Sequence, residues 1–196
     1  ATLLHIARPA EANLVGPDAD FWSEPTYLLF LRQVLADKKV KSKDKEPLMA
    51  QIKKFNSSSP GTVIQNFDYT TRHGARHNLY EQSAPVKILL LEPADCSDCS
   101  LNRLRLQADI ATGQLIKDNQ AKILLIRPGK PDKAWDSAME NLPFQWEVGS
   151  SETISDLVDT RKLPSNYILD ADNKILMRNL TIDQLLNLTA SLYRQK

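Results

Sequence analysis

The sequence predicts an α/β fold in which a central mixed sheet, flanked by helices, follows an N-terminal helical extension. Residues 87–92 and 121–127 are continuous apolar runs separated by an amphipathic helical segment, the pattern of two parallel strands joined by a crossover helix. Residues 166–170 and 174–178 flank a short turn and predict an antiparallel hairpin in the same sheet. A chain of 196 residues has room for one such domain and an appendage.

Residues 1–60 are predicted to form an arm and a helical extension ahead of the main domain. Residues 1–17 show no clear period and include Pro9, so we expect an extended arm. Apolar residues at helical spacing predict a pair of helices, one beginning near Ser23 and one near Asp44. The breaker sequence NSSSPG follows this pair, and the boundary is placed after residue 60.

The main domain is predicted to span residues 61–196 and to begin with a β-hairpin. Residues 63–69 alternate as a strand, residues 70–76 form a loop that contains Gly74, and residues 77–80 return. Beyond the strand at residues 87–92, a helix is expected after Cys99. Its apolar residues recur at helical spacing and predict its buried stripe: Leu101, Leu104, Ala108, Ala111 and Leu115.

The second half of the domain alternates short helices and strands. After the apolar run at residues 121–127, we expect a helix at residues 132–139 and a strand at residues 144–148. A short helix at residues 153–158 precedes the hairpin. Thr181 and Gln184 have the spacing of a capping box, which predicts the start of the last helix.

The two cysteines of the chain form the motif Cys96-Ser97-Asp98-Cys99. A C-x-x-C motif between a buried strand and a helix is typical of a thiol–disulfide redox site. At a helix N-terminus, unpaired N–H groups favour a Cys96 thiolate, which would attack a disulfide, and Cys99 would resolve the mixed disulfide. The neighbouring carboxylates of Asp95 and Asp98 oppose the thiolate, so we expect a Cys96 pKa that is not strongly depressed and a reducing role.

Other roles for the cysteine pair are weaker but remain open. A static disulfide across so short a loop would stabilise the fold by only about 2 kcal/mol. An inert pair in a binding module is a second alternative. A zinc site would need further ligands such as His73 and His77, and the chain lacks the spacing that structural zinc sites show.

Residues 61–196 resemble the thioredoxin-like proteins of bacterial envelopes, the group that includes the cytochrome-maturation thioredoxins. The hairpin before the central strand, the segment KILLLEPADCSDC and the segment LPSNYILD at residues 163–170 carry this resemblance. It implies that Pro164 is cis and lies against the disulfide, in one site with Cys96 and Cys99. Across its whole length, the chain is most similar to thioredoxin-like lipoproteins of Bacteroidales.

The chain departs from the family pattern around the motif. The family has Trp where this chain has Asp95, and Gly-Pro or Pro-Pro where it has Ser97-Asp98. On the central strand, Leu90 stands where thioredoxins carry a buried carboxylate, and Glu92 is the nearest acidic residue. These departures bear on the efficiency and direction of the reaction more than on the fold.

The resemblance implies thiol–disulfide exchange with exported proteins of the bacterial envelope, supported by an electron donor that the sequence does not identify. A lipid anchor upstream of this chain fits the same picture, because the chain begins with Ala1 and we expect its targeting information to have been removed. The net charge of +1 gives no indication of nucleic-acid binding, and no segment approaches the length of a membrane span. No motif predicts a cofactor or a metal. The competing function is a thioredoxin-like module that holds a peptide without redox turnover.

Overall fold

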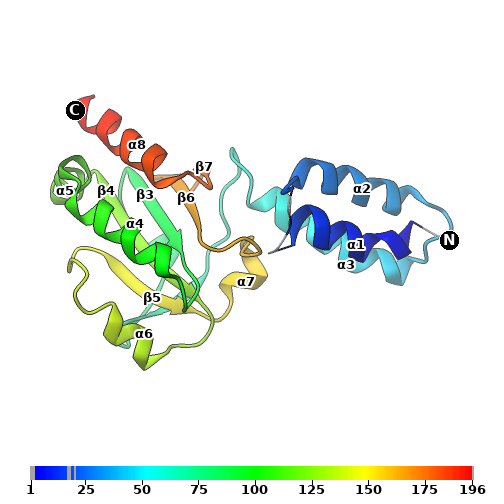
Figure 1. Ribbon diagram of the computed structural model, residues 1–196, viewed down its shortest axis with the longest axis horizontal. Coiled ribbons are helices and arrows are strands. Elements are labelled where there is room, and N and C mark those ends of the chain that lie inside the picture. Colours follow the sequence, from blue (N-terminus) through cyan, green and yellow to red (C-terminus); the bar gives the residue numbers. More distant parts are fainter. Residues whose placement is uncertain (1–2, 17–18, 20, 196) are drawn as a thin grey trace. The chain divides into compact units, whose positions relative to one another are not determined.

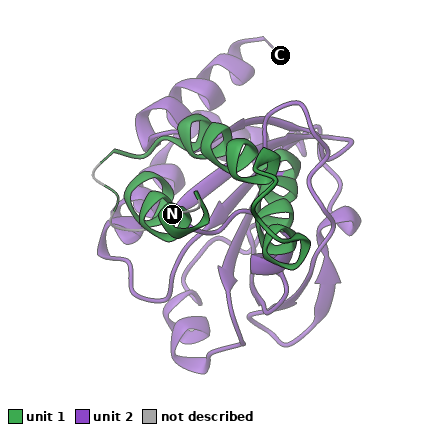
Figure 2. Ribbon diagram, turned by 90° about the vertical axis from the view of Figure 1, so that its right-hand side faces the viewer, with its two compact units in different colours: residues 1–57 green, residues 58–196 purple. Residues whose placement is uncertain are grey.

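The computed structural model describes residues 3–16, 19 and 21–195, and its internal contacts divide the chain into two compact units. Unit 1 is residues 1–57 and unit 2 is residues 58–196; Figure 2 shows them in different colours. Each unit has its own buried core, so each is described by itself.

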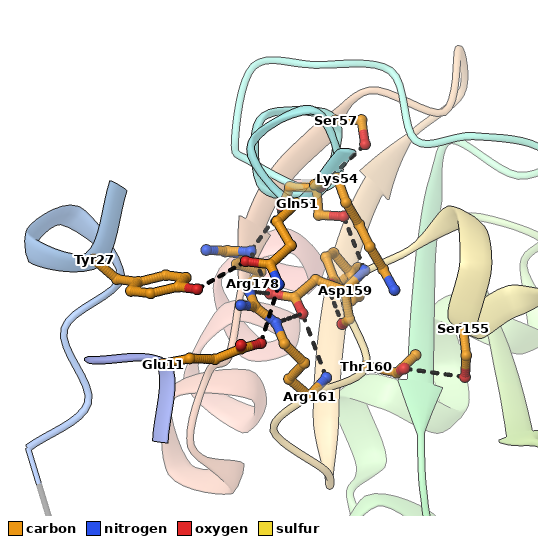
Figure 3. A network of polar contacts seen from close by, with 12 residues as sticks. Glu11, Tyr27, Gln51, Lys54, Ser57, Ser155, Asp159, Thr160, Arg161 and Arg178 are labelled. Atoms are coloured by element: carbon orange, nitrogen blue, oxygen red, sulfur yellow. Dashed lines mark hydrogen bonds and ion pairs between the residues drawn. The ribbon is translucent and has the colours of Figure 1, made fainter. Parts of the chain in front are cut away.

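Unit 1 is helical. It contains α1 (Leu4–Val15), α2 (Glu24–Ala36) and α3 (Ser42–Ser57), which pack around a shared apolar core. Beside this core, the Tyr27 hydroxyl donates to Gln51 Oε1 at 2.8 Å, and Gln51 Nε2 donates to Glu11 at 3.2 Å (Figure 3). The fully buried members of the core are Val15, Tyr27, Leu31 and Val34.

The extended arm predicted for residues 1–17 is wrong, because most of this segment forms α1 and unit 1 has more than a pair of helices. Pro9 lies inside α1, where it removes one backbone hydrogen bond. Burial of Val15 in the core of unit 1, with Leu4 and Leu14 packed against that core, outweighs this cost. The Asn13 side chain also donates to the Pro9 carbonyl oxygen at 2.7 Å.

Unit 2 is built on a seven-stranded mixed sheet with the order β2-β1-β5-β4-β3-β6-β7. The central strand β3 runs parallel to β4 and antiparallel to β6, which confirms the predicted crossover and hairpin. The strands are β1 (Asp68–Thr71), β2 (Arg76–Asn78), β3 (Val86–Leu91), β4 (Ala121–Pro128), β5 (Glu147–Ser151), β6 (Ser165–Asp170) and β7 (Ile175–Arg178).

Helices cover both faces of this sheet (Figure 1). Residues of α4, α6 and α8 pack with Ile88 and Leu90 on one face. Residues of α7 pack with Leu89 and Leu91 on the other, so β3 is buried on both faces, as its continuous apolar sequence predicts. The helices of unit 2 are η1 (Leu79–Glu81), α4 (Ser97–Ala108), α5 (Ile110–Lys117), α6 (Lys133–Ala138), α7 (Ile154–Leu157) and α8 (Ile182–Arg194).

The strand predicted at residues 63–69 begins later in the structure, where β1 spans Asp68–Thr71. The preceding segment runs beside β7 as an irregular chain, with a single bridge between Val63 and Lys174. Its Ile64 is still fully buried, and the Ile64 N–H donates to the Asn173 carbonyl at 2.9 Å. The apolar alternation therefore reports burial at this position rather than a strand.

Two further predictions need correction. The stripe predicted to be buried after Cys99 is buried only at its far end: Leu101 is 62% exposed and Leu104 is 60% exposed, whereas Leu115 of α5 is 3% exposed. The helix starts at Ser97 and breaks at Asp109, which caps α5, and Cys99 and Leu106 are the buried residues of α4. The strand predicted at residues 144–148 is β5, which begins at Glu147, and Phe144 is 87% exposed in the preceding loop.

Candidate redox site

The C-x-x-C motif lies where the central strand ends and α4 begins. Residues 92–96 connect Leu91, the last residue of β3, to Ser97, the first residue of α4. Cys96 is the N-cap of the helix, and it forms a disulfide with Cys99, with the two Cα atoms 5.3 Å apart. The prediction that Cys96 lies at the N-terminus of the helix is therefore confirmed.

The two sulfurs have different surroundings. Cys96 is partly exposed, whereas Cys99 is 1% exposed beneath the first turn of α4. The backbone N–H of Cys99 donates to Cys96 Sγ at 3.2 Å. An N–H donor and the positive end of the helix dipole both stabilise negative charge on the Cys96 sulfur once the disulfide is reduced.

The Leu163–Pro164 peptide bond is cis, as the resemblance implies. Pro164 and Cys99 line one cavity of about 140 Å³, together with Glu92 and Arg103. A separate groove of about 450 Å³ opens beside Cys96. The structure thus brings Cys99 and Pro164 together at one cavity and turns Cys96 toward the other.

A buried ion pair between Glu92 and Arg103 lies next to the disulfide. The Arg103 guanidinium donates to Glu92 Oε2 through one nitrogen and to the Ser100 hydroxyl, at 2.9 Å, through another. The Arg103 side chain is 11% exposed, and the Glu92 side chain is 7% exposed. Burial raises the pKa of Glu92, and the charge of Arg103 and its hydrogen bond act in the opposite direction.

The sequence pointed to Glu92 only as the nearest acidic residue and did not single out Arg103. A sequence signal for Arg103 existed, because it follows Cys99 by one helical turn and so lies on the same face of α4. The pairing with Glu92 depends on how α4 packs at the end of β3. Local sequence patterns do not report that packing.

The remaining charges around Cys96 are carboxylates. Asp95 and Asp98 are exposed on either side of it. Asp132 lines the groove and caps α6 by accepting the N–H groups of Ala134 and Trp135. The groove beside Cys96 therefore combines carboxylates with the single cation of Arg103 among its lining residues.

A second ionic network fixes the segment that leads to Pro164. Both nitrogens of the Arg161 fork donate to the Asp159 carboxylate, at 2.7 and 2.8 Å, and Arg178 lies 4.0 Å away (Figure 3). The Tyr167 hydroxyl donates to the Asp159 carbonyl at 2.9 Å, which ties the segment to β6. Burial alone would raise the pKa of Asp159, but the Arg161 hydrogen bonds and charge outweigh it and lower that pKa.

No grouping of three His, Cys, Asp or Glu side chains suited to a metal ion occurs within residues 3–16, 19 and 21–195. The His77 ring instead pairs with Glu81 at 3.2 Å, and His73 accepts from Arg72 at 3.3 Å. In the same described ranges, no helix has the length and apolar character needed to cross a membrane.

The sheet order, the disulfide at the start of α4 and the cis proline that lines a cavity with Cys99 define a thioredoxin-like fold, and solved structures agree. A thioredoxin-like protein from Bacteroides caccae superposes with a TM-score of 0.78 at 24% identity, covering 95% of this chain and 69% of that one. The thioredoxin domain of a thiol-disulfide oxidoreductase from Bacteroides vulgatus superposes with a TM-score of 0.57 at 18% identity, covering 69% of this chain and 98% of that one.

A third solved structure, the C-terminal domain of an uncharacterised protein from Bacteroides fragilis, gives a TM-score of 0.63 at 24% identity. It covers 68% of this chain and 99% of that one. Neither a protein-family model nor a curated protein matches the chain. The comparisons confirm the predicted fold, with its N-terminal helices, and its likeness to thioredoxin-like proteins of Bacteroides.

Proposed function

We propose that this protein is a thiol–disulfide oxidoreductase that reduces disulfides of exported proteins through Cys96 and Cys99. The observation that carries the proposal is the asymmetry of the pair: Cys96 is accessible at a helix N-cap, and Cys99 is buried one turn later. Thiol-disulfide oxidoreductases from Bacteroides with the same fold support it. We place Pro164 in the site because it lines a cavity with Cys99.

The exchange needs no cofactor. The Cys96 thiolate attacks one sulfur of a substrate disulfide, an S–S bond forms between them, and the other substrate sulfur leaves as a thiolate that takes a proton from water. Cys99 then loses its proton and attacks Cys96, and the second substrate sulfur leaves and is protonated. Two electrons pass to the substrate, and a thiol donor must reduce the Cys96–Cys99 disulfide again.

The direction of exchange follows from the charges at the site. Asp95 and Asp98 oppose a Cys96 thiolate, whereas the helix N-terminus favours it. We infer that these carboxylates offset much of the stabilisation of the Cys96 thiolate, which makes the pair a reductant rather than a strong oxidant. We propose that the chain acts in the bacterial envelope, because disulfides of exported proteins form and persist there.

Trapping of mixed disulfides tests this function. Cys99→Ser should accumulate a covalent adduct with a disulfide-bonded peptide, because the adduct has no resolving thiol, and Cys96→Ser should form none. Non-reducing electrophoresis and mass spectrometry of the adduct give the measurement. If both variants form adducts equally, or neither forms any, the exchange mechanism is wrong; a Cys96→Ser chain that keeps its partners would favour a binding module.

A further inference from the structure

The Glu92–Arg103 ion pair has a definite orientation relative to the two sulfurs. The groove beside Cys96 is lined by Arg103 and not by Glu92. The cavity beside Cys99 is lined by both Glu92 and Arg103. Arg103 therefore lines both the groove that contains Cys96 and the cavity that contains Cys99, whereas Glu92 lines only the cavity that contains Cys99.

We propose that this ion pair gives the two cysteines different protonation states in the reduced protein. Arg103 stabilises the Cys96 thiolate, and Glu92 keeps Cys99 protonated until the mixed disulfide has formed. Arg103 and Glu92 are positioning residues in this account, because neither takes part in the bond exchange. The inference rests on the proposed thiol–disulfide exchange and adds the device that separates an attacking thiol from a resolving thiol.

The surrounding charges explain why such a device is needed. The carboxylates near Cys96 all oppose its ionisation, and among the residues that line its groove only Arg103 is cationic. Burial strengthens the field of the pair, since water screens it weakly at 11% and 7% exposure of the two side chains. The hydrogen bond from Arg103 to Ser100 ties the guanidinium to the first turn of α4. The charged residues that line the two cavities are Glu92, Asp95, Arg103 and Asp132, and Asp98 lies between the two cysteines in the sequence.

The test is the pH dependence of alkylation of each cysteine in the reduced full-length chain, with mass spectrometry of peptides separating Cys96 from Cys99. Arg103→Gln should raise the Cys96 pKa by about one unit, seen as roughly ten-fold slower alkylation below that pKa. Arg103→Lys keeps the charge and should restore most of the loss. Glu92→Gln should lower the pKa of both thiols, because Arg103 is then no longer partly neutralised.

Arg105→Gln is the matched control, since it removes the same charge from the same helix. Arg105 pairs with Asp183 at the surface and lines neither cavity, so its loss should leave the Cys96 pKa unchanged. The proposal is overturned if Arg103→Lys shifts the Cys96 pKa as far as Arg103→Gln does. It is also overturned if Glu92→Gln leaves that pKa unchanged or raises it.

Two features keep the test decisive. If Arg103→Gln fails to fold, Glu92→Gln still decides, because a lowered Cys96 pKa is predicted for it independently of any other variant. Alkylation needs no substrate disulfide, so the ion-pair inference can hold in a chain that fails to exchange with peptides, and it can fail in a chain that exchanges well. The two proposals are thus separated by experiment.

Discussion

At the scale of single residues, unit 2 holds two partly or wholly buried ion pairs in places that bear on the site. Glu92 and Arg103 lie beside the disulfide, and Asp159 and Arg161 lie in the segment before Pro164. Buried pairs of this kind are costly to break, because the partner that is left keeps an uncompensated charge. The contribution of such a pair to the free energy of unfolding is therefore measured best by replacing one charged side chain with a neutral side chain of the same shape.

Asp159→Asn should lower the free energy of unfolding by about 3 kcal/mol at neutral pH, because Arg161 and Arg178 lose their carboxylate. Since the folded-state pKa of Asp159 is lowered, the stability it contributes is present above the ordinary Asp value and is lost as the pH falls through the folded-state value. Urea denaturation of both proteins across this range gives the measurement.

The control for this prediction is Asp156→Asn, which makes the same change at an exposed carboxylate nearby. Asp156→Asn should change the stability little at any pH. The account of Asp159 would be contradicted if the two substitutions cost the same, or if the difference between wild type and Asp159→Asn grew as the pH fell.

Sequence reasoning found the residues whose chemistry is local and missed those whose partners are distant. The spacing of Cys96 and Cys99 was sufficient to predict a disulfide at a helix start, and the structure has it. Asp159 carries no pattern of its own in the sequence, and the spacing of Arg103 from Cys99 indicates a shared helix face but not the pairing with Glu92. Their roles come from packing between α4, β3 and the segment before β6, which a one-dimensional pattern does not encode.

At the scale of elements, the last helix is the clearest case of a local signal that held. Thr181 and Gln184 form the predicted capping box, and α8 begins directly after Thr181. The helix buries Leu185 in the core that also holds Ile88 and Leu90 of the central strand. By stabilising α8, the cap therefore stabilises the core on the face of the sheet that α4 also covers.

Thr181→Ala should lower the free energy of unfolding by about 1 kcal/mol, because the Gln184 N–H loses its acceptor. Urea denaturation midpoints at constant slope give this value. Thr153→Ala is the control, since Thr153 precedes α7 without a side-chain cap. Equal losses for the two substitutions would show that the capping hydrogen bond is not the cause.

Helix α4 shows where element-level prediction failed. Its apolar residues recur at helical spacing, but Leu101 and Leu104 face solvent and Leu106 faces the core. The prediction assumed one continuous helix, whereas Asp109 ends α4 and caps α5 through the Thr112 N–H. Periodicity fixes which residues share a face and leaves open which face meets the sheet.

At the scale of the whole molecule, the chain contains separate cores in two units. The core of unit 1 is formed by residues between Leu3 and Phe55, including Val40 from the α2–α3 connection, and the two cores of unit 2 lie on opposite faces of the sheet. The order of strands and helices was sufficient to predict unit 2, because βαβ and hairpin units have few allowed arrangements. Unit 1 was less predictable. Pro9 in the sequence argued against a helix, and α1 forms because tertiary packing stabilises it.

The reduction potential of the Cys96–Cys99 pair in the full chain tests the central claim most directly. The protein is equilibrated in dithiothreitol redox buffers, and free thiols are trapped with a maleimide. The account predicts one cooperative two-electron transition near the thioredoxin range of roughly −270 mV. A pair that stays untitrated across these buffers, or a potential near that of a strong oxidant at roughly −120 mV, would contradict it.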